Sequence, residues 1–170
     1  MTDQIAAFFG SLPKELITAI IAMIPIAELR GAIPWALASP PIGGGLTWPV
    51  AFFYAAIGNM IPVIPLLLFF EKFYRFLSRY SIFNRFFEWL FARTRKKGKL
   101  IEKYETIGLI LFVGIPLPVT GAWTGALAAF LFGIRLKTAF PAIFLGIIMA
   151  GTIVTLASFG VINFLSFILH

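Results

Sequence analysis

The sequence is poor in the residue types on which most enzymes depend. It contains no cysteine, which excludes disulfide bonds, thiol nucleophiles and thiolate metal sites. Its only histidine is His170, to which we assign no role. Charged residues make up 12% of the chain, whereas about 25% is usual for soluble domains. The remaining pattern matches no catalytic triad, metal site or phosphate-binding loop, so we expect no enzyme active site, metal or cofactor.

Hydrophobic residues are what the sequence has in excess, at 60% of its 170 positions. A helix needs about 20 apolar residues to cross a bilayer core of ~30 Å. Residues 49–70 and residues 138–169 are long enough, although Asn59, Pro62 and Pro65 interrupt the first of them. This pattern is typical of a multi-pass integral membrane protein rather than a soluble domain.

Positive charge is concentrated between the two predicted spans. Residues 71–105 hold ten basic residues against four acidic ones, a net charge of +6 out of +7 for the chain. In a membrane protein such a cluster marks a cytoplasmic loop. Because membrane topology accounts for the positive charge, we expect no nucleic-acid partner. Apolar residues from Phe73 to Tyr80 recur there at helical spacing beside lysine and arginine. They predict an amphipathic helix over residues 71–93 on the inner leaflet.

Two further apolar segments are too interrupted to be ordinary spans. Residues 16–38 are cut at Pro25, at two charges and at Pro34, and residues 106–134 carry GIPLPVTG at their centre. Because proline removes a backbone donor and clashes with the preceding turn, each segment should form two half-helices of about ten residues. Basic residues flank the second segment on both sides, which places both its ends in the cytoplasm. We expect two re-entrant hairpins, since broken backbone at membrane depth must be buried in protein or line a cavity.

The order of these elements repeats along the chain. A shift of 91 residues lays IPIAELRGAIPWALA on IPLPVTGAWTGALAA. A hairpin followed by a span occurs in residues 11–70 and again in residues 106–170. The first hairpin must return to the outside and the second to the inside, so the halves are inverted, as in many transporters. The predicted fold is one all-α membrane domain over residues 1–170, with two inverted repeats joined by the cytoplasmic loop.

The stretch AELRGAIP, residues 27–34, places Glu28 and Arg30 inside the first interrupted segment. A charge there costs at least about 2.5–3.5 kcal/mol, which makes both residues functional candidates. Two positions apart on a regular helix, their side chains would point in different directions. Either the backbone unwinds at this point or each residue has its own partner. The structural alternative is a fixed ion pair, or snorkelling to the interface, that only holds the fold.

The second interrupted segment has a comparable break without charge. Pro116 and Pro118 should end its first half-helix, and Thr120 or Gly121 should open the next one, with Thr120 as the natural N-cap. If the two tips meet near the midplane, two helix N-termini and Arg30 would form a centre for a phosphate or a carboxylate.

The other residues of the two tips complete the predicted site. Glu28 would balance Arg30 when the site is empty, or carry a proton. Glycines would allow close approach of the backbone, and Trp35 and Trp123 could wall a cavity. The predicted substrate-binding residues are Glu28, Arg30, Gly31, Pro34, Pro116, Pro118, Thr120, Gly121, Trp123, Thr124 and Gly125.

ELRGAIP together with GIPLPVTGAWTG resembles the prokaryotic family of small multidrug export proteins over nearly the whole chain. That family is distantly similar to the DedA, or SNARE-associated (VTT), membrane proteins. The resemblance implies re-entrant hairpins in inverted repeats, the inner membrane of a prokaryote, and transport, with lipid-phosphate carriers handled by some DedA members. The second motif departs from the DedA pattern, because PLPVTGAW lacks the acidic residue that is common there.

These observations lead us to expect a transporter or lipid flippase for an anionic small molecule or lipid phosphate, proton-coupled through Glu28. One alternative is a membrane scaffold that binds anionic lipid through its basic helix. Another is an intramembrane lipid-phosphate enzyme, with Glu28 as base and Thr120 or Thr124 as a weak nucleophile. Membrane lipids are expected partners, and so short a chain is expected to need a second copy to enclose a pathway.

Overall fold

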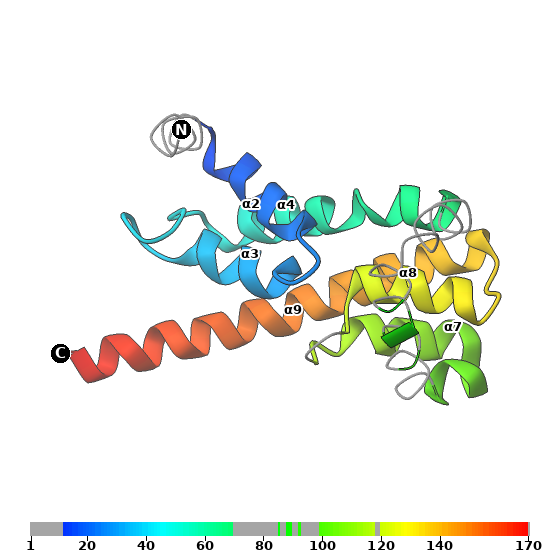
Figure 1. The fold of residues 1–170 in the computed structure, drawn as a ribbon. Coiled ribbons are helices and arrows are strands. Elements are labelled where there is room, and N and C mark those ends of the chain that lie inside the picture. The colour runs from blue at the N-terminus through cyan, green and yellow to red at the C-terminus, as the bar shows by residue number, and fades with distance from the viewer. Residues whose placement is uncertain are drawn as a thin grey trace. The chain divides into compact units, whose positions relative to one another are not determined.

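Every regular element that the structure describes is helical. The computed structural model describes residues 12–69, 85, 88, 89, 92, 99–117 and 120–169, and no strand occurs among them. The all-α prediction is therefore confirmed for this part of the chain. Its six helices, drawn in Figure 1, are α2 (Lys14–Met23), α3 (Glu28–Leu37), α4 (Trp48–Met60), α7 (Lys99–Gly114), α8 (Ala122–Leu131) and α9 (Leu136–Leu169).

The chain divides into two compact units. One comprises residues 1–59 with 151–170, and the other comprises residues 60–150. The first unit contains α2, α3, nearly all of α4 and the C-terminal part of α9. The second contains α7, α8 and the N-terminal part of α9. Each interrupted segment therefore lies wholly within one unit.

Two helices are long and apolar enough to cross a membrane. They cover Trp48–Phe69, with 22 residues, and Leu136–Val161, with 26 residues. The first begins as α4, makes a turn at Ile61 and Pro62, and resumes as helix at residue 63. This turn is expected because Pro62 has no backbone N–H to continue the helix. The predicted spans 49–70 and 138–169 fall on these two helices.

The first interrupted segment folds as a hairpin of α2 and α3 (Figure 1). Each helix has 10 residues, which corresponds to a length of about 15 Å, half of a ~30 Å hydrocarbon core. Small residues let the helices approach closely, since Ala22, Ala32 and Ala36 are fully buried. The predicted break at Pro25 is confirmed. The predicted break at Pro34 is wrong, because α3 continues through Pro34 and its carbonyl accepts the N–H of Ala38 at 3.0 Å.

Glycines allow the close contacts of both units. In the first unit a Cβ at Gly58 would lie 2.6 Å from the Cα of Ala19, so α4 and α2 touch through their backbones. In the second unit a Cβ at Gly146 would lie 2.6 Å from the Cβ of Val113, which brings α9 against α7. Substitution at either glycine would force the two helices apart.

The basic loop 71–105 lies mostly outside the described residues. Arg85, Glu88, Trp89 and Ala92 are helical and exposed, and α7 begins within the loop at Lys99. The amphipathic helix over residues 71–93 stays a prediction.

Candidate functional site

The turn between α2 and α3 is short and is closed by backbone hydrogen bonds. Ile24 leaves α2 in an extended conformation, and its N–H donates to the carbonyl of Ile21 at 3.1 Å. The N–H of Glu28 then donates to the carbonyl of Ile24 at 2.9 Å. The second helix of the hairpin, α3, begins at Glu28. This turn, Ile24–Ala27 together with Glu28 and Arg30, is called the charged turn below.

Glu28 has the one positive φ angle found for a residue other than glycine in the described part of the chain, at 44°. Positive φ brings the Cβ of an L residue too close to its own backbone and typically costs about 1–3 kcal/mol. Such a conformation persists only where the surroundings impose it, and outliers of this kind gather at ligand sites and switches. The strain at Glu28 is therefore a functional indication that residue type alone does not give.

The irregular backbone lets Glu28 and Arg30 pair although they are two positions apart. Glu28 Oε2 lies 3.7 Å from Arg30 Nη2, which is an ion pair but is longer than a hydrogen bond. The Glu28 side chain is 6% exposed and the Arg30 side chain is 28% exposed. The predicted departure from regular helix is found at Glu28, where φ is 44°. The pair presents a buried carboxylate and a partly exposed guanidinium.

Apolar side chains surround the charged turn on its outer side. Ile26 at the apex is 91% exposed and Ile24 is 46% exposed, whereas Leu29 and Ile33 are buried. An exposed apolar apex over a buried carboxylate is the reverse of what water favours. It suits a turn that is surrounded by lipid or by another apolar surface.

Gly31 and Pro34 shape the first turns of α3 behind the ion pair. The N–H of Gly31 donates to the carbonyl of Ala27 at 2.8 Å, and a Cβ at Gly31 would lie 2.9 Å from the Cβ of Ala27. Pro34 has no backbone N–H, so it cannot donate the helical hydrogen bond to the carbonyl of Arg30, four residues earlier. Both residues thus support the predicted site through the backbone.

The turn between α7 and α8 is held by a hydroxyl group. Thr120 is 4% exposed, and its Oγ1 accepts the N–H of Leu117 at 3.2 Å. The same oxygen lies 3.0 Å from the carbonyl of Ile115 and 2.9 Å from that of Leu117, so its hydrogen is donated within the turn. We call this turn, residues 115–121, the hydroxyl turn. Pro116 lies in it two residues after the end of α7, which ends before this proline as predicted, whereas Pro118 lies outside the described residues.

The prediction that Thr120 caps α8 is wrong. The N-cap is Gly121, with φ 157° and ψ −164°, and no side chain caps the helix. Glycine alone adopts this region readily. Thr124 Oγ1 reaches back to the Gly121 carbonyl at 3.3 Å, and the N–H of Gly125 donates to the same carbonyl at 2.8 Å. The hydroxyl of Thr120 is used to fold the turn instead.

The remaining predicted residues are placed around the two turns. Gly125 faces α7, where a Cβ would meet the side chain of Val113. Trp123 is half-buried near the start of α8, and Trp35 is half-buried in α3. The carbonyl of Trp35 accepts the N–H of Gly44 at 2.9 Å, so part of its role is to hold the following loop. The two turns belong to separate units, and the meeting of their tips stays a prediction.

Asn59 is a buried polar residue that sequence reasoning undervalues. Its Oδ1 accepts no hydrogen bond from the part of the chain that the structure describes, although the residue is only 1% exposed. A buried acceptor without a donor typically costs about 1–3 kcal/mol. It lies in the first candidate span, one residue after the close contact of Gly58, and is thus a second polar candidate in the unit that holds the charged turn.

No group of three or more metal-ligating side chains of the histidine, cysteine or carboxylate type occurs within the described residues.

One family comparison is informative. A family model described as "Putative small multi-drug export protein" matches residues 28–153, a range that contains every predicted substrate-binding residue. No curated protein and no solved structure matches the chain. The distant similarity to the DedA proteins stays a prediction.

Proposed function

The chain belongs to the small multi-drug export protein family, and we propose that it is a membrane transporter that binds an anionic group at the charged turn. The observation that carries the proposal is Glu28, a buried carboxylate on a backbone with φ 44°, paired at 3.7 Å with Arg30. A charge inside an apolar segment is costly and marks a substrate or proton pathway by default. The strained backbone at Glu28 supports a functional role, since such outliers gather at ligand sites and switches.

The chemistry of the pair fits a phosphate or a carboxylate. A guanidinium presents parallel N–H donors that match two oxygens of such a group, and charge-assisted bonds of this kind are short and strong. At 3.7 Å the Glu28 carboxylate is attracted to Arg30 without the geometry of a two-pronged hydrogen bond. A substrate anion that reaches the partly exposed guanidinium can therefore replace Glu28 as its closest partner.

Glu28 is the proposed site of proton binding. When an anion occupies Arg30, the guanidinium shares its charge with that anion, and the attraction that favours a charged Glu28 becomes weaker. Uptake of a proton by Glu28 removes that charge. Substrate binding and proton binding are then linked, which is the basis of the proposed proton coupling.

The proposed setting is a bilayer, with both hairpins re-entrant. Two apolar helices long enough to cross a membrane and the family membership support a membrane location. The half-length helices of α2 and α3 and the exposed apolar apex at Ile26 support a hairpin that dips into the hydrocarbon core and returns. Because basic residues are concentrated in loop 71–105, we propose that this loop is cytoplasmic. The membrane is then the plasma membrane of a prokaryote.

Binding of candidate ligands to purified protein tests the proposal. Thermal stability would be measured with inorganic phosphate, citrate, a short-chain lipid phosphate and the cationic dye ethidium. We expect at least one anion to raise the melting temperature of the wild-type protein but not of the Arg30→Gln variant. Arg135→Gln is the matched control, because Arg135 is an exposed arginine outside both turns.

The pattern of stabilisation separates the possible outcomes. A shift with lipid phosphate but not with inorganic phosphate identifies a flippase-type substrate. Stabilisation by ethidium alone, lost in the Glu28→Gln variant, would contradict the anion site and make Glu28 the recognition residue for a cation. Equal stabilisation of wild-type and Arg30→Gln proteins by every anion would refute the proposed role of Arg30.

A further inference from the structure

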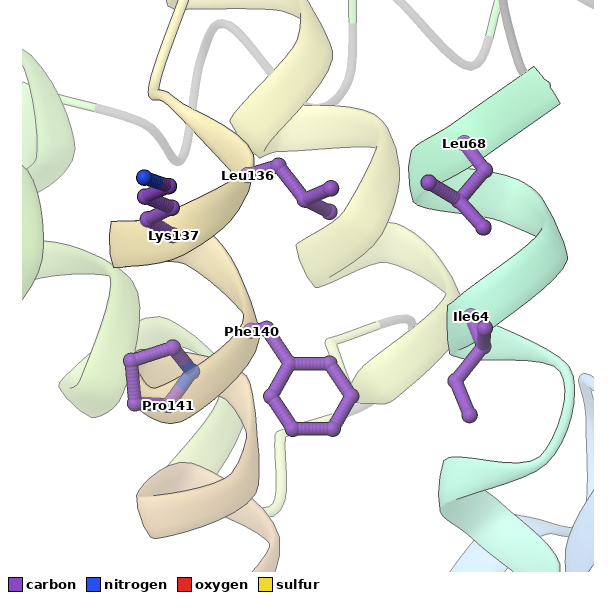
Figure 2. Close-up of a pocket in the computed structure, with 6 residues that line it drawn as sticks. All are labelled: Ile64, Leu68, Leu136, Lys137, Phe140 and Pro141. Carbon is purple, nitrogen blue, oxygen red and sulfur yellow. The ribbon is translucent and has the colours of Figure 1, made fainter.

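A shallow groove lies within the second unit. It has a volume of about 350 Å³ and is lined by Ile64, Leu68, Leu136, Lys137, Phe140 and Pro141. Figure 2 shows Leu136 and Phe140 extending from α9 toward Ile64 and Leu68 on the facing helix, with Lys137 and Pro141 on the other flank of α9. None of the predicted substrate-binding residues lines it. The groove is thus separate from the proposed transport site.

The residues that line the groove lie at two levels. Leu68, Leu136 and Lys137 lie at one level, and Ile64, Phe140 and Pro141 lie at the other (Figure 2). The two levels are one helical turn apart on each helix, or about 6 Å. The first level is where the Trp48–Phe69 span ends and the Leu136–Val161 span begins. One end of the groove therefore lies at the level of the membrane surface, and the other end lies deeper in the apolar region.

Charge is confined to the boundary end. Lys137 is the single charged residue among the six that line the groove, and it forms no ion pair with any acidic side chain in the described part of the chain. It is the second residue of α9, whose N-terminus adds partial positive charge. The neighbouring Arg135 is also exposed. This end attracts anions, whereas the deeper end excludes them.

We propose that the groove binds one anionic phospholipid, with the phosphate at Lys137 and part of an acyl chain against Ile64 and Phe140. A free phosphate would gain nothing from the five apolar side chains, and a purely apolar partner would leave the ammonium without a counter-charge. An anionic lipid matches both ends of the groove. Its headgroup lies at the membrane surface, where Lys137 is, and its acyl chains lie deeper, where the groove is apolar. The proposal does not depend on transport.

Lipid binding to purified protein tests this assignment. Native mass spectrometry in detergent would compare phosphatidylglycerol with phosphatidylcholine of the same acyl chains. We expect the wild-type protein to prefer phosphatidylglycerol, and Lys137→Gln to lower that preference by about fivefold, since one basic residue near an anionic lipid contributes about that factor. Lys137→Arg should retain the preference, which guards against a folding defect in Lys137→Gln.

Two comparisons decide whether the groove, rather than general surface charge, is responsible. Arg135→Gln removes the same charge two residues away without touching the groove, and it should retain most of the preference. Phe140→Ala should weaken the binding of both lipids. Equal losses in Lys137→Gln and Arg135→Gln, or no preference for phosphatidylglycerol in the wild-type protein, would overturn the proposal.

Discussion

The charged turn and the hydroxyl turn reverse an apolar chain by different means. In the first, four residues separate α2 from α3, and the reversal ends on a strained Glu28 that pairs with Arg30. In the second, seven residues separate α7 from α8, and Thr120 joins the turn through hydrogen bonds to Ile115 and Leu117. In the second turn, the described hydrogen bonds of the Thr120 hydroxyl all go to residues of the turn itself. The first turn keeps two formal charges, of which the carboxylate is buried.

The comparison separates architecture from function. The hydroxyl turn uses a proline two residues after α7, a glycine before α8 and one buried hydroxyl. The charged turn also has a proline two residues after the end of its first helix, but it has an ion pair and backbone strain in place of the glycine and the hydroxyl. The ion pair and the strain are the features that the transport proposal uses, and variants of the two turns test this difference.

The largest effect is expected from removing one charge of the pair. Arg30→Met removes the guanidinium that lies 3.7 Å from the buried Glu28 carboxylate, and breaking a buried ion pair typically costs about 3–5 kcal/mol of stability. Chemical unfolding in detergent micelles would measure it. The double variant Glu28→Gln with Arg30→Met should recover most of the loss, because no buried charge remains. A double variant as unstable as the single one would show that packing, not charge, dominates the charged turn.

A smaller loss is expected in the hydroxyl turn. Thr120→Val keeps the shape of the side chain but removes the hydrogen bonds to the turn, at a typical cost of about 1–3 kcal/mol. The same unfolding assay measures this loss, and anion-dependent stabilisation should be unchanged. A Thr120→Val protein that unfolds like the wild type but no longer responds to anions would reverse the roles assigned to the two turns.

A gain of about 1 kcal/mol is expected at Asn59, whose buried Oδ1 has no donor among the described residues. Asn59→Leu replaces the amide by an apolar side chain of similar size and should raise the melting temperature. If Asn59 serves the substrate pathway, the stabilised variant should also lose substrate response. A less stable Asn59→Leu protein would show that the amide is satisfied by a group or a water molecule that binds there.

The smallest effect isolates the backbone strain. In the Arg30→Met background, Glu28→Gly and Glu28→Gln both lack the charge, but only glycine accepts positive φ without strain. We expect the glycine variant to be more stable by about 1 kcal/mol, measured by unfolding in micelles. Equal stabilities would indicate that the backbone at residue 28 relaxes once the ion pair is absent.

Much of the hairpin architecture follows from the sequence because proline and glycine act locally. The first helices of the two segments, α2 and α7, end at Met23 and Gly114, which are 91 residues apart, the same offset that aligns the two motifs. Pro25 and Pro116, each two residues after the end of its helix, explain both ends. With 16 residues, α7 is longer than the predicted half-helix of about ten. The interruption of the first span at Pro62 follows from the same rule.

The details of the site depend on contacts between elements and on backbone angles, which residue types do not specify. Glutamate gives no sign that it will adopt a positive φ, so the pairing of Glu28 with Arg30 could not be derived. Thr120 is a good N-cap by type, but a seven-residue turn brings its hydroxyl to carbonyls instead. The loop at Gly43–Gly45 returns to the end of α3, which depends on the path of the chain.

The central claim is that the charged turn is the tip of a hairpin that enters and leaves the membrane on one side. Because the chain has no cysteine, single cysteines can report sidedness directly. Lys14→Cys and Ser39→Cys mark the two open ends of the first hairpin, and Lys99→Cys and Arg135→Cys mark those of the second. With a membrane-impermeant maleimide on right-side-out and inverted vesicles, we predict labelling of the first pair from outside and of the second pair from inside. Labelling of Lys14→Cys and Ser39→Cys from opposite sides would contradict the account.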